Sequence, residues 1–346
     1  MTRPMIAHRG RAFEELFARL EAGLRDVLLT ARPVYISTSS ASGLMEGAVR
    51  NAPPGALLAL VNGAFSSRFA KIAKACGRDV DVVEAPWGNT FDLDEVDRRL
   101  GSRRYAAVTV VHSETSTGAL TDVRAVSDLA HRHGALCIVD SVSGVGGAEL
   151  RFDAWGLDFV LTGSQKALAL PPGLAFGVAS SEFVRRAREV RDRGLYFDVV
   201  EFEEFAAKNQ TPATPALSLL YALDAQLADV LREGIERRWE RHAAMRDATV
   251  AWLKRAVTRV HLDISILAPD SARSPTITAI TLPDGLKSAD VVSAVARRGF
   301  VIGAGYGKLK DTTIRIGHMG DHSVETLRGC LAECEDALRD VGGIKW

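Results

Sequence analysis

A single lysine stands between two apolar, strand-like runs in the middle of this sequence. Lys166 lies in the stretch 163–173, which holds no acidic residue, with the apolar runs 159–162 before it and 174–179 after it. A lysine buried at such a turn loses solvation, which lowers the pKa of its amine and makes the neutral nucleophile available for Schiff-base chemistry. An ordinary lysine on a surface loop is the alternative, and these surroundings favour the buried nucleophile.

A carboxylate, Asp140, follows directly after another apolar run, 136–139. A carboxylate at the end of a buried strand needs a cation or a strong hydrogen-bond donor. Asp140 could cap the next turn, because residues 141–147 are mostly small, or it could face a protonated heterocyclic nitrogen. Since Lys166 follows one strand–helix–strand unit later, we favour the heterocyclic nitrogen.

A turn of small residues at 39–43 joins a predicted strand at 34–38 to a predicted helix at 44–51. The free amides of a first helical turn, together with serine hydroxyls, can hold a phosphate. A capped helix without a ligand fits the same pattern. Near the other end of the chain, Arg315 lies in a predicted strand, 312–316, and it could either face solvent or clamp a substrate carboxylate with its two-pronged guanidinium.

The elements that must position these residues alternate along the first two thirds of the chain. Helices are predicted at 12–29, 66–76, 92–100 and 123–133, and strands at 56–61, 79–84, 106–111 and 136–139. The strands are continuous apolar runs, which is typical of a largely parallel sheet covered on both faces. Ligands of such sheets bind beyond the carboxyl ends of the strands. Polar residues gather there, at 40–42, 112–118, 140–143 and in the lysine stretch.

The last third of the chain has a different pattern. Helices are predicted at 217–231 and 237–257, and the charge-rich segment 232–238 reads as the solvated middle of a long connection, which divides the chain into domains 1–235 and 236–346. Strands are then predicted at 262–267, 276–282, 300–303 and 312–316, and helices at 289–298 and 323–341. This pattern predicts a small C-terminal α+β domain beside a large α/β domain.

Composition excludes several classes of function. The chain has 346 residues with 43 basic and 43 acidic side chains, so no long-range field favours nucleic acid or an anionic membrane. It has no apolar run of 18 residues and no secretory signal, and its four cysteines suit a reduced cytoplasm. Cys330 and Cys334 share the apolar face of a predicted helix without a third ligand, so we expect core packing and no metal site.

The motifs together resemble the class V aminotransferases, closest to the alanine–glyoxylate and serine–glyoxylate (serine–pyruvate) group. The resemblance rests on Ser-Gln-Lys-Ala-Leu at 164–168 with Pro-Pro-Gly at 171–173, Val-Asp-Ser-Val-Ser at 139–143, His-Ser-Glu-Thr-Ser-Thr-Gly at 112–118 and Arg-Ile-Gly-His-Met-Gly at 315–320. It implies the fold-type I architecture, a large domain with a mixed, mostly parallel sheet plus a small C-terminal domain, and pyridoxal 5'-phosphate as cofactor.

The resemblance also implies roles for single residues. Lys166 would bond covalently to the cofactor and carry the substrate proton, and Asp140 would pair with the ring nitrogen. The phosphate would be held by Gln165, Ala41, Ser42 and Gly43 at the helix start. Phe65 would stack on the ring with Val142 on its other face, Thr115 would lie near the ring hydroxyl and the substrate, and Arg315 would bind the substrate carboxylate.

A loop at 208–212 resembles the segment through which one subunit of these enzymes reaches the phosphate of its neighbour, with Thr211 as the contact. That resemblance implies a homodimer with shared active sites; a plain connection between helices is the alternative. Relatives usually carry a Thr-Pro-Gly-Pro-type segment before the residues that match Met5 to Arg9, a segment that packs near the substrate, and this sequence begins just after it.

The expected reaction is a ping-pong transfer of an amino group from alanine or serine to glyoxylate or pyruvate. Two alternatives stay open. One is another class V chemistry, desulfuration or elimination, and a desulfurase would need a mobile nucleophilic cysteine. The other is a homologue that binds the cofactor without turnover.

Overall fold

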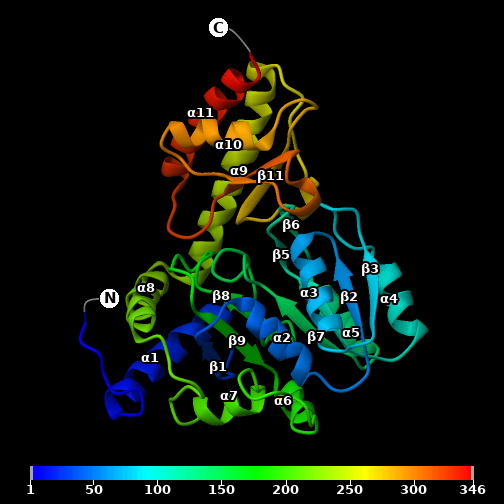
Figure 1. Cartoon of the computed structure of the whole chain (residues 1–346), viewed down its shortest axis with the longest axis vertical. Coiled ribbons are helices and arrows are strands. Elements are labelled where there is room, and N and C mark those ends of the chain that lie inside the picture. The colour runs from blue at the N-terminus through cyan, green and yellow to red at the C-terminus, as the bar shows by residue number, and fades with distance from the viewer. Residues whose placement is uncertain (1–2, 344–346) are drawn as a thin grey trace.

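A seven-stranded sheet forms the centre of the larger part of the molecule in the computed structural model, which describes residues 3–343 (Figure 1). The strands lie in the order β1 (Val34–Ser37), β9 (Ala175–Ala179), β8 (Phe159–Gly163), β7 (Leu136–Asp140), β4 (Tyr105–Val111), β2 (Ala56–Val61) and β3 (Val80–Glu84). The pairs from β8 to β3 are parallel, whereas β9 runs antiparallel to both of its neighbours. The predicted mixed, mostly parallel sheet is therefore confirmed.

The reversed direction of β9 follows from its connection to β8. Residues 164–174 join the two strands without a helix, so the chain turns back beside the strand that it has just left. Parallel neighbours need a crossover, which usually contains a helix. This direct return places Lys166 at the edge of the sheet where β4, β7 and β8 end.

Helices cover both faces of the sheet. One face packs against α1 (Arg11–Leu28), α4 (Leu93–Ser102), α5 (Val123–Arg132) and α8 (Leu217–Glu233), and the other against α2 (Ala41–Asn51), α3 (Ala64–Ala75), α6 (Ser181–Ala187) and α7 (Val199–Ala206). Leu58 and Leu60 of β2 belong to the first core and Leu57 to the second. Alternate residues thus enter opposite cores, which is why the strand is apolar along its whole length.

The smaller part follows α9 (Ile235–Val260), a long helix that rises from the large sheet to the C-terminal elements (Figure 1). An antiparallel sheet there has the order β10 (Ser265–Ile266), β11 (Ile277–Thr281), β13 (Thr313–Gly317) and β12 (Gly303–Ala304). It packs with α9, α10 (Ser288–Arg297) and α11 (Val324–Val341) around a core of its own, with two short 3₁₀ turns, η1 (Asp270–Ala272) and η2 (Gly307–Leu309). The predicted α+β layer is confirmed.

Three local predictions differ from the structure. In the segment 232–238, Arg232, Glu236 and Arg237 are exposed, but Arg238 is buried, and the segment is no long connection because Gly234 alone separates α8 from α9. The strand predicted at 300–303 is shifted: Val301 is 92% exposed, and β12 begins at Gly303, where the chain first pairs with β13. The hairpin of β5 (Ser113–Glu114) and β6 (Ala119–Leu120) was not predicted, nor were α6 and α7.

Two absences hold for residues 3–343. No helix in that range is long and apolar enough to cross a membrane. Nor does any group of three or more metal-binding side chains come together within it.

Candidate active site

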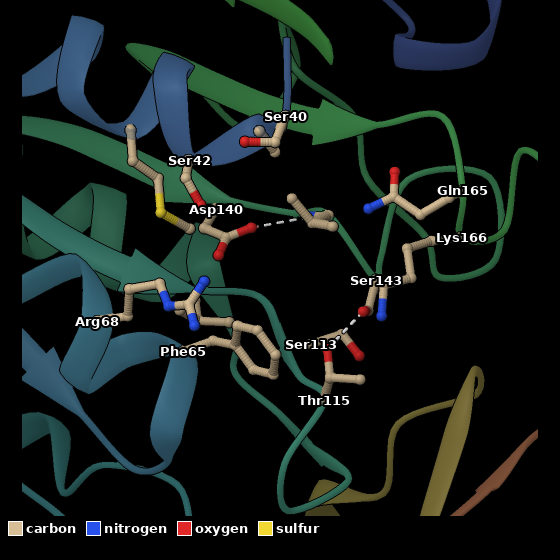
Figure 2. A pocket seen from close by; sticks show the side chains of 14 residues that line it. Ser40, Ser42, Phe65, Arg68, Ser113, Thr115, Asp140, Ser143, Gln165 and Lys166 are labelled. Carbon is tan, nitrogen blue, oxygen red and sulfur yellow. Dashed lines mark hydrogen bonds between the residues drawn. The ribbon is translucent and has the colours of Figure 1, made fainter. Parts of the chain in front are cut away.

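A cavity of about 270 Å³ opens beyond the carboxyl ends of β4 and β7, between the first turns of α2 and α3 and the turn that follows β8 (Figure 2). Its lining consists of Ser40, Ala41, Ser42, Met45, Phe65, Arg68, Val111, Ser113, Thr115, Asp140, Val142, Ser143, Gln165 and Lys166. The parallel strands of the sheet end at this edge, as the sequence pattern predicted.

Lys166 extends into this cavity from a tightly tied turn. Ser164 anchors the turn, because its hydroxyl donates to the carbonyl of Pro171 at 2.7 Å and its amide donates to the carbonyl of Leu174 at 3.0 Å. Burial lowers the pKa of Lys166, the neighbouring Arg315 cation lowers it further, and Asp140 opposes both. The amine is therefore nearer to its neutral, nucleophilic form than a lysine in water.

Asp140 ends β7 as a buried carboxylate that is only partly satisfied. Its Oδ1 accepts a hydrogen bond of 2.9 Å from the amide of Val142, and no other donor to this carboxylate is found within residues 3–343. Burial raises the pKa of Asp140 to about 7, although the Val142 hydrogen bond and Lys166 act in the other direction. A cation placed beside this carboxylate would favour its ionised form.

The first turn of α2 presents free amides and hydroxyls to the cavity. Ser40 is the N-cap residue, and its side chain makes no capping hydrogen bond. Among the described groups, none accepts a hydrogen bond from the amides of Ala41 and Ser42. Gln165 lies beside this turn: a Cβ built on Gly163 would lie 3.0 Å from Gln165 Oε1 and 3.7 Å from Ala41 Cβ. These groups suit an anion such as a phosphate.

Phe65 stands at the start of α3, where a buried carboxylate holds its backbone. Glu114 is 0% exposed and accepts hydrogen bonds from the amides of Phe65 and Ser66 and from the hydroxyls of Ser66 and Ser116. Tyr306 stacks on the Phe65 ring, with the ring centroids 5.3 Å apart. The aromatic ring is thus fixed at the cavity wall from two sides.

Thr115 and Arg315 connect the cavity to the small domain. The hydroxyl of Thr115 lies 2.5 Å from that of Ser143, and both side chains face the cavity beside Lys166 (Figure 2). Arg315 of β13 donates from Nη1 to the Thr115 carbonyl at 3.1 Å and from Nε to the Ala304 carbonyl at 2.8 Å. Its Nη2 has no hydrogen-bond partner in the described part of the chain, so this terminal nitrogen of the guanidinium remains available to a ligand.

Three residues named from the sequence, Gly43, Thr211 and Arg315, are not among the residues that line this cavity. Gly43 is in α2, but it packs against Phe197, whose Cζ would lie 2.3 Å from an added Cβ. Thr211 lies in a separate pocket with Thr38 and Tyr196, and its hydroxyl donates to the Ala213 carbonyl at 2.7 Å. The cavity of a single chain therefore brings together the remaining predicted residues. Arg315 is linked to the cavity wall by its hydrogen bond to the Thr115 carbonyl.

Sequence reasoning missed Met45 and Arg68, and it placed Ser113 and Glu114 among the polar residues at this edge of the sheet without giving either a role. Arg68 follows Phe65 by three positions in α3, and helical spacing could have placed both on one face. A carboxylate at 114 inside a run of hydroxyl residues was a further signal, because such an acid is buried only where donors surround it.

The described residues fit pyridoxal phosphate. The cavity offers an amine with a lowered pKa, a buried carboxylate with free acceptor capacity, an aromatic wall and unpaired helix amides. These four features correspond to the aldehyde, the ring nitrogen, the ring face and the phosphate of that cofactor.

Comparison with known proteins agrees with this chemistry. The family model for "Aminotransferase class-V" matches residues 37–313. The serine–glyoxylate aminotransferase of Arabidopsis thaliana is 33% identical, covering 90% of this chain and 79% of its own. A protein of Synechococcus sp. named as the small subunit of a soluble hydrogenase is also 33% identical, over 97% of this chain and 88% of its own.

The fold agrees equally well with a crystal structure. The alanine–glyoxylate aminotransferase of Nostoc sp. superposes with a TM-score of 0.90 at 29% sequence identity, covering 97% of this chain and 90% of that one. The fold-type I architecture expected from the motifs is thereby confirmed.

Proposed function

The chain belongs to the class V aminotransferases, enzymes that depend on pyridoxal phosphate, and from this premise we propose that it moves the amino group of alanine or serine to glyoxylate or pyruvate by a ping-pong mechanism. The observation that carries the proposal is that Lys166 and Asp140 line one cavity together with Phe65. The printed activities of the Arabidopsis and Nostoc relatives support serine, alanine and glyoxylate as substrates.

Each residue of the cavity has a task in this proposal. Lys166 would hold the cofactor and take the proton from the substrate Cα, since the lowered pKa of its amine favours the neutral form that can accept a proton. When bound, pyridoxal phosphate supplies the electron sink for that proton removal. Asp140 would keep the ring nitrogen protonated through an ion pair, and Phe65 and Val142 would hold the ring.

The remaining groups bind and orient. The amides of Ala41 and Ser42, with Gln165, would hold the phosphate and so orient the cofactor relative to Lys166. Thr115 would orient the ring hydroxyl and the substrate. Arg315 receives the substrate carboxylate on its free prong, so that the Cα–H bond points toward the amine.

The proposal extends to a homodimer in which Thr211 of one subunit reaches the phosphate of the other. Thr211 supports this by its position outside the cavity of its own chain. Arg9 braces the loop, since its Nη1 donates to the Thr211 carbonyl at 2.7 Å and to Gln210 Oε1 at 3.1 Å. These hydrogen bonds would keep the loop in one conformation when it contacts the neighbouring subunit.

The proposal is tested by the first half-reaction. Purified protein loaded with pyridoxal phosphate is mixed with alanine, serine, aspartate or cysteine, and the absorbance spectrum is followed. Conversion of the cofactor band by alanine or serine, reversed by glyoxylate or pyruvate, supports the proposal. Sulfide release from cysteine would instead indicate desulfuration, and an unchanged spectrum with every amino acid would indicate a homologue without turnover.

A further inference from the structure

Arg238, on the first turns of α9, is a buried cation that joins three separate segments. The residue is 2% exposed. Its Nη2 donates to the backbone carbonyl of Ala167 at 2.7 Å and to Oδ1 of Asp321 at 2.8 Å, and its Nη1 donates to Oε2 of Glu233 at 2.8 Å. The carbonyl that it binds belongs to the residue that directly follows Lys166.

The lysine turn, residues 164–174 between β8 and β9, depends on this contact. Within the described residues, Arg238 is the one donor to the Ala167 carbonyl. Two positions later Ala169 has φ of 56°, a left-handed conformation that costs an alanine free energy and persists only where its surroundings enforce it. Gly320 presses on the same turn, since a Cβ there would lie 3.2 Å from Ala169 Cβ.

Residues 320–322 come shortly after β13, the strand that carries Arg315, and α9 binds them too. The amide of Gly320 donates to Nε2 of His242 at 3.1 Å, so the Nδ1 of that ring donates to the Arg238 carbonyl at 2.7 Å. Arg241 donates to the carbonyls of Gly320 and His322 and to Glu233. One turn of α9 thus binds both the lysine turn and residues 320–322, which follow β13.

Stability alone gives a weak reason for a cation at this place. The Nε of Arg238 is buried and has no hydrogen-bond partner among residues 3–343, and a buried ion pair often contributes no more to stability than an apolar side chain of similar volume. Glu233 would remain paired with Arg241 if Arg238 were replaced, and Asp321 is exposed enough to be hydrated. The Ala167 carbonyl is the group that would lose its donor.

We propose that Arg238 is a positioning residue that fixes the lysine turn through the Ala167 carbonyl. It thereby sets how far the Lys166 amine extends into the cavity and where the amine lies relative to Arg315. The proposal rests on the proposed function in taking Lys166 as the reacting amine. Its effect on the turn itself requires no bound cofactor.

The test measures Lys166 in cofactor-free protein. Wild type, Arg238→Met, Arg238→Lys and Arg241→Met are treated with limiting acetic anhydride over a range of pH, and acetylation of Lys166 is quantified by mass spectrometry against the exposed Lys254. Arg241→Met is the matched control, because Arg241 makes similar ties to Glu233 and residues 320–322 without touching the lysine turn. The charged groups that act on the amine, Asp140 and Arg315, are the same in all four proteins.

We expect the labelling midpoint of Lys166 to rise by about half a pH unit or more in Arg238→Met, since a displaced turn gives the amine more water, and to stay at the wild-type value in Arg241→Met. In loaded enzyme, Arg238→Met should lower kcat by about tenfold or more while KM stays within about twofold.

An unchanged midpoint in a cooperatively folded Arg238→Met protein, or an equal shift in Arg241→Met, would overturn the proposal. If Arg238→Met does not fold, Arg238→Lys decides, because its single ammonium cannot serve Ala167, Asp321 and Glu233 with the same geometry. An intermediate shift supports the proposal, and a wild-type midpoint and kcat contradict it. A wild type without aminotransferase activity would refute the proposed function and leave the labelling result valid.

Discussion

Arg315 donates a hydrogen bond of 3.1 Å to the backbone carbonyl of Thr115, although the two residues stand 200 positions apart in the chain. Thr115 lines the cavity beside Lys166, so this bond brings a strand of the small domain to the wall of a site built by the large one. Any movement between the two domains would change the distance between the arginine and the lysine. This relationship makes Arg315 the first residue to test.

Replacing Arg315 with lysine should raise KM for the amino acid and the 2-oxo acid by about tenfold to a hundredfold, with a smaller change in kcat. Lysine keeps the positive charge but loses the two-pronged geometry that suits a carboxylate. Steady-state kinetics with both substrates check this. A primary amine without a carboxylate serves as the control, and an equal loss with that amine would show that Arg315 does not bind the carboxylate.

Asp140→Asn should make the cofactor-free protein more stable at pH 8 and leave it nearly unchanged at pH 4. Burial raises the pKa of Asp140 from 3.8 to about 7, so the folded protein keeps a proton that the unfolded chain has lost. The stability that comes from this proton is present below about pH 4 and is lost as the pH rises through 7. We expect a gain of about 2–4 kcal/mol at pH 8, measured by denaturant unfolding. Equal stability of the two proteins at pH 8 would contradict this account.

Phe65→Ala should weaken binding of pyridoxal phosphate by about tenfold, because the ring loses its stacking partner, whereas Phe65→Trp should bind the cofactor about as well as wild type. Absorbance titration of cofactor-free protein measures both affinities. The backbone of residue 65 stays anchored to Glu114 in either variant, so the comparison isolates the side chain. Wild-type affinity in Phe65→Ala would remove the ring from the cofactor site.

Shared active sites predict a specific result in a hybrid dimer. When Lys166→Ala and Thr211→Val subunits are combined, the one remaining lysine site receives its Thr211 from the partner subunit. That site should bind the cofactor with wild-type affinity, whereas the Thr211→Val homodimer should bind about threefold to tenfold more weakly. Sedimentation first establishes the dimer. A monomer, or weak binding in the hybrid, would contradict the shared site.

The sequence predicted the parts of the site that depend on local pattern. Asp140 ends one apolar strand and Lys166 follows the next strand by three residues, and the ends of neighbouring parallel strands must meet at one edge. Arg68 depends instead on how α3 is rotated against the sheet, a tertiary property with a weak local signal. Thr211 could be named only by resemblance, because nothing near it in the chain indicates a ligand.

Long-range packing also explains why the expected solvation of 232–238 fails at Arg238. A charge-rich run is usually solvated, yet Arg238 is buried because Ala167, Asp321 and Glu233 surround it, two of them from distant parts of the chain. No periodicity in the sequence encodes those contacts. The shift of β12 has a similar origin: the run at 300–303 is mostly apolar, but pairing with β13 selects Gly303 and Ala304.

Covalent attachment of the cofactor to Lys166 can be measured directly. Protein loaded with pyridoxal phosphate is reduced with borohydride and digested, and the modified peptide is identified by mass spectrometry. We predict that the cofactor is attached to Lys166 and that the Lys166→Ala protein shows neither the modification nor turnover. Attachment to a different lysine, or full activity in Lys166→Ala, would contradict the account.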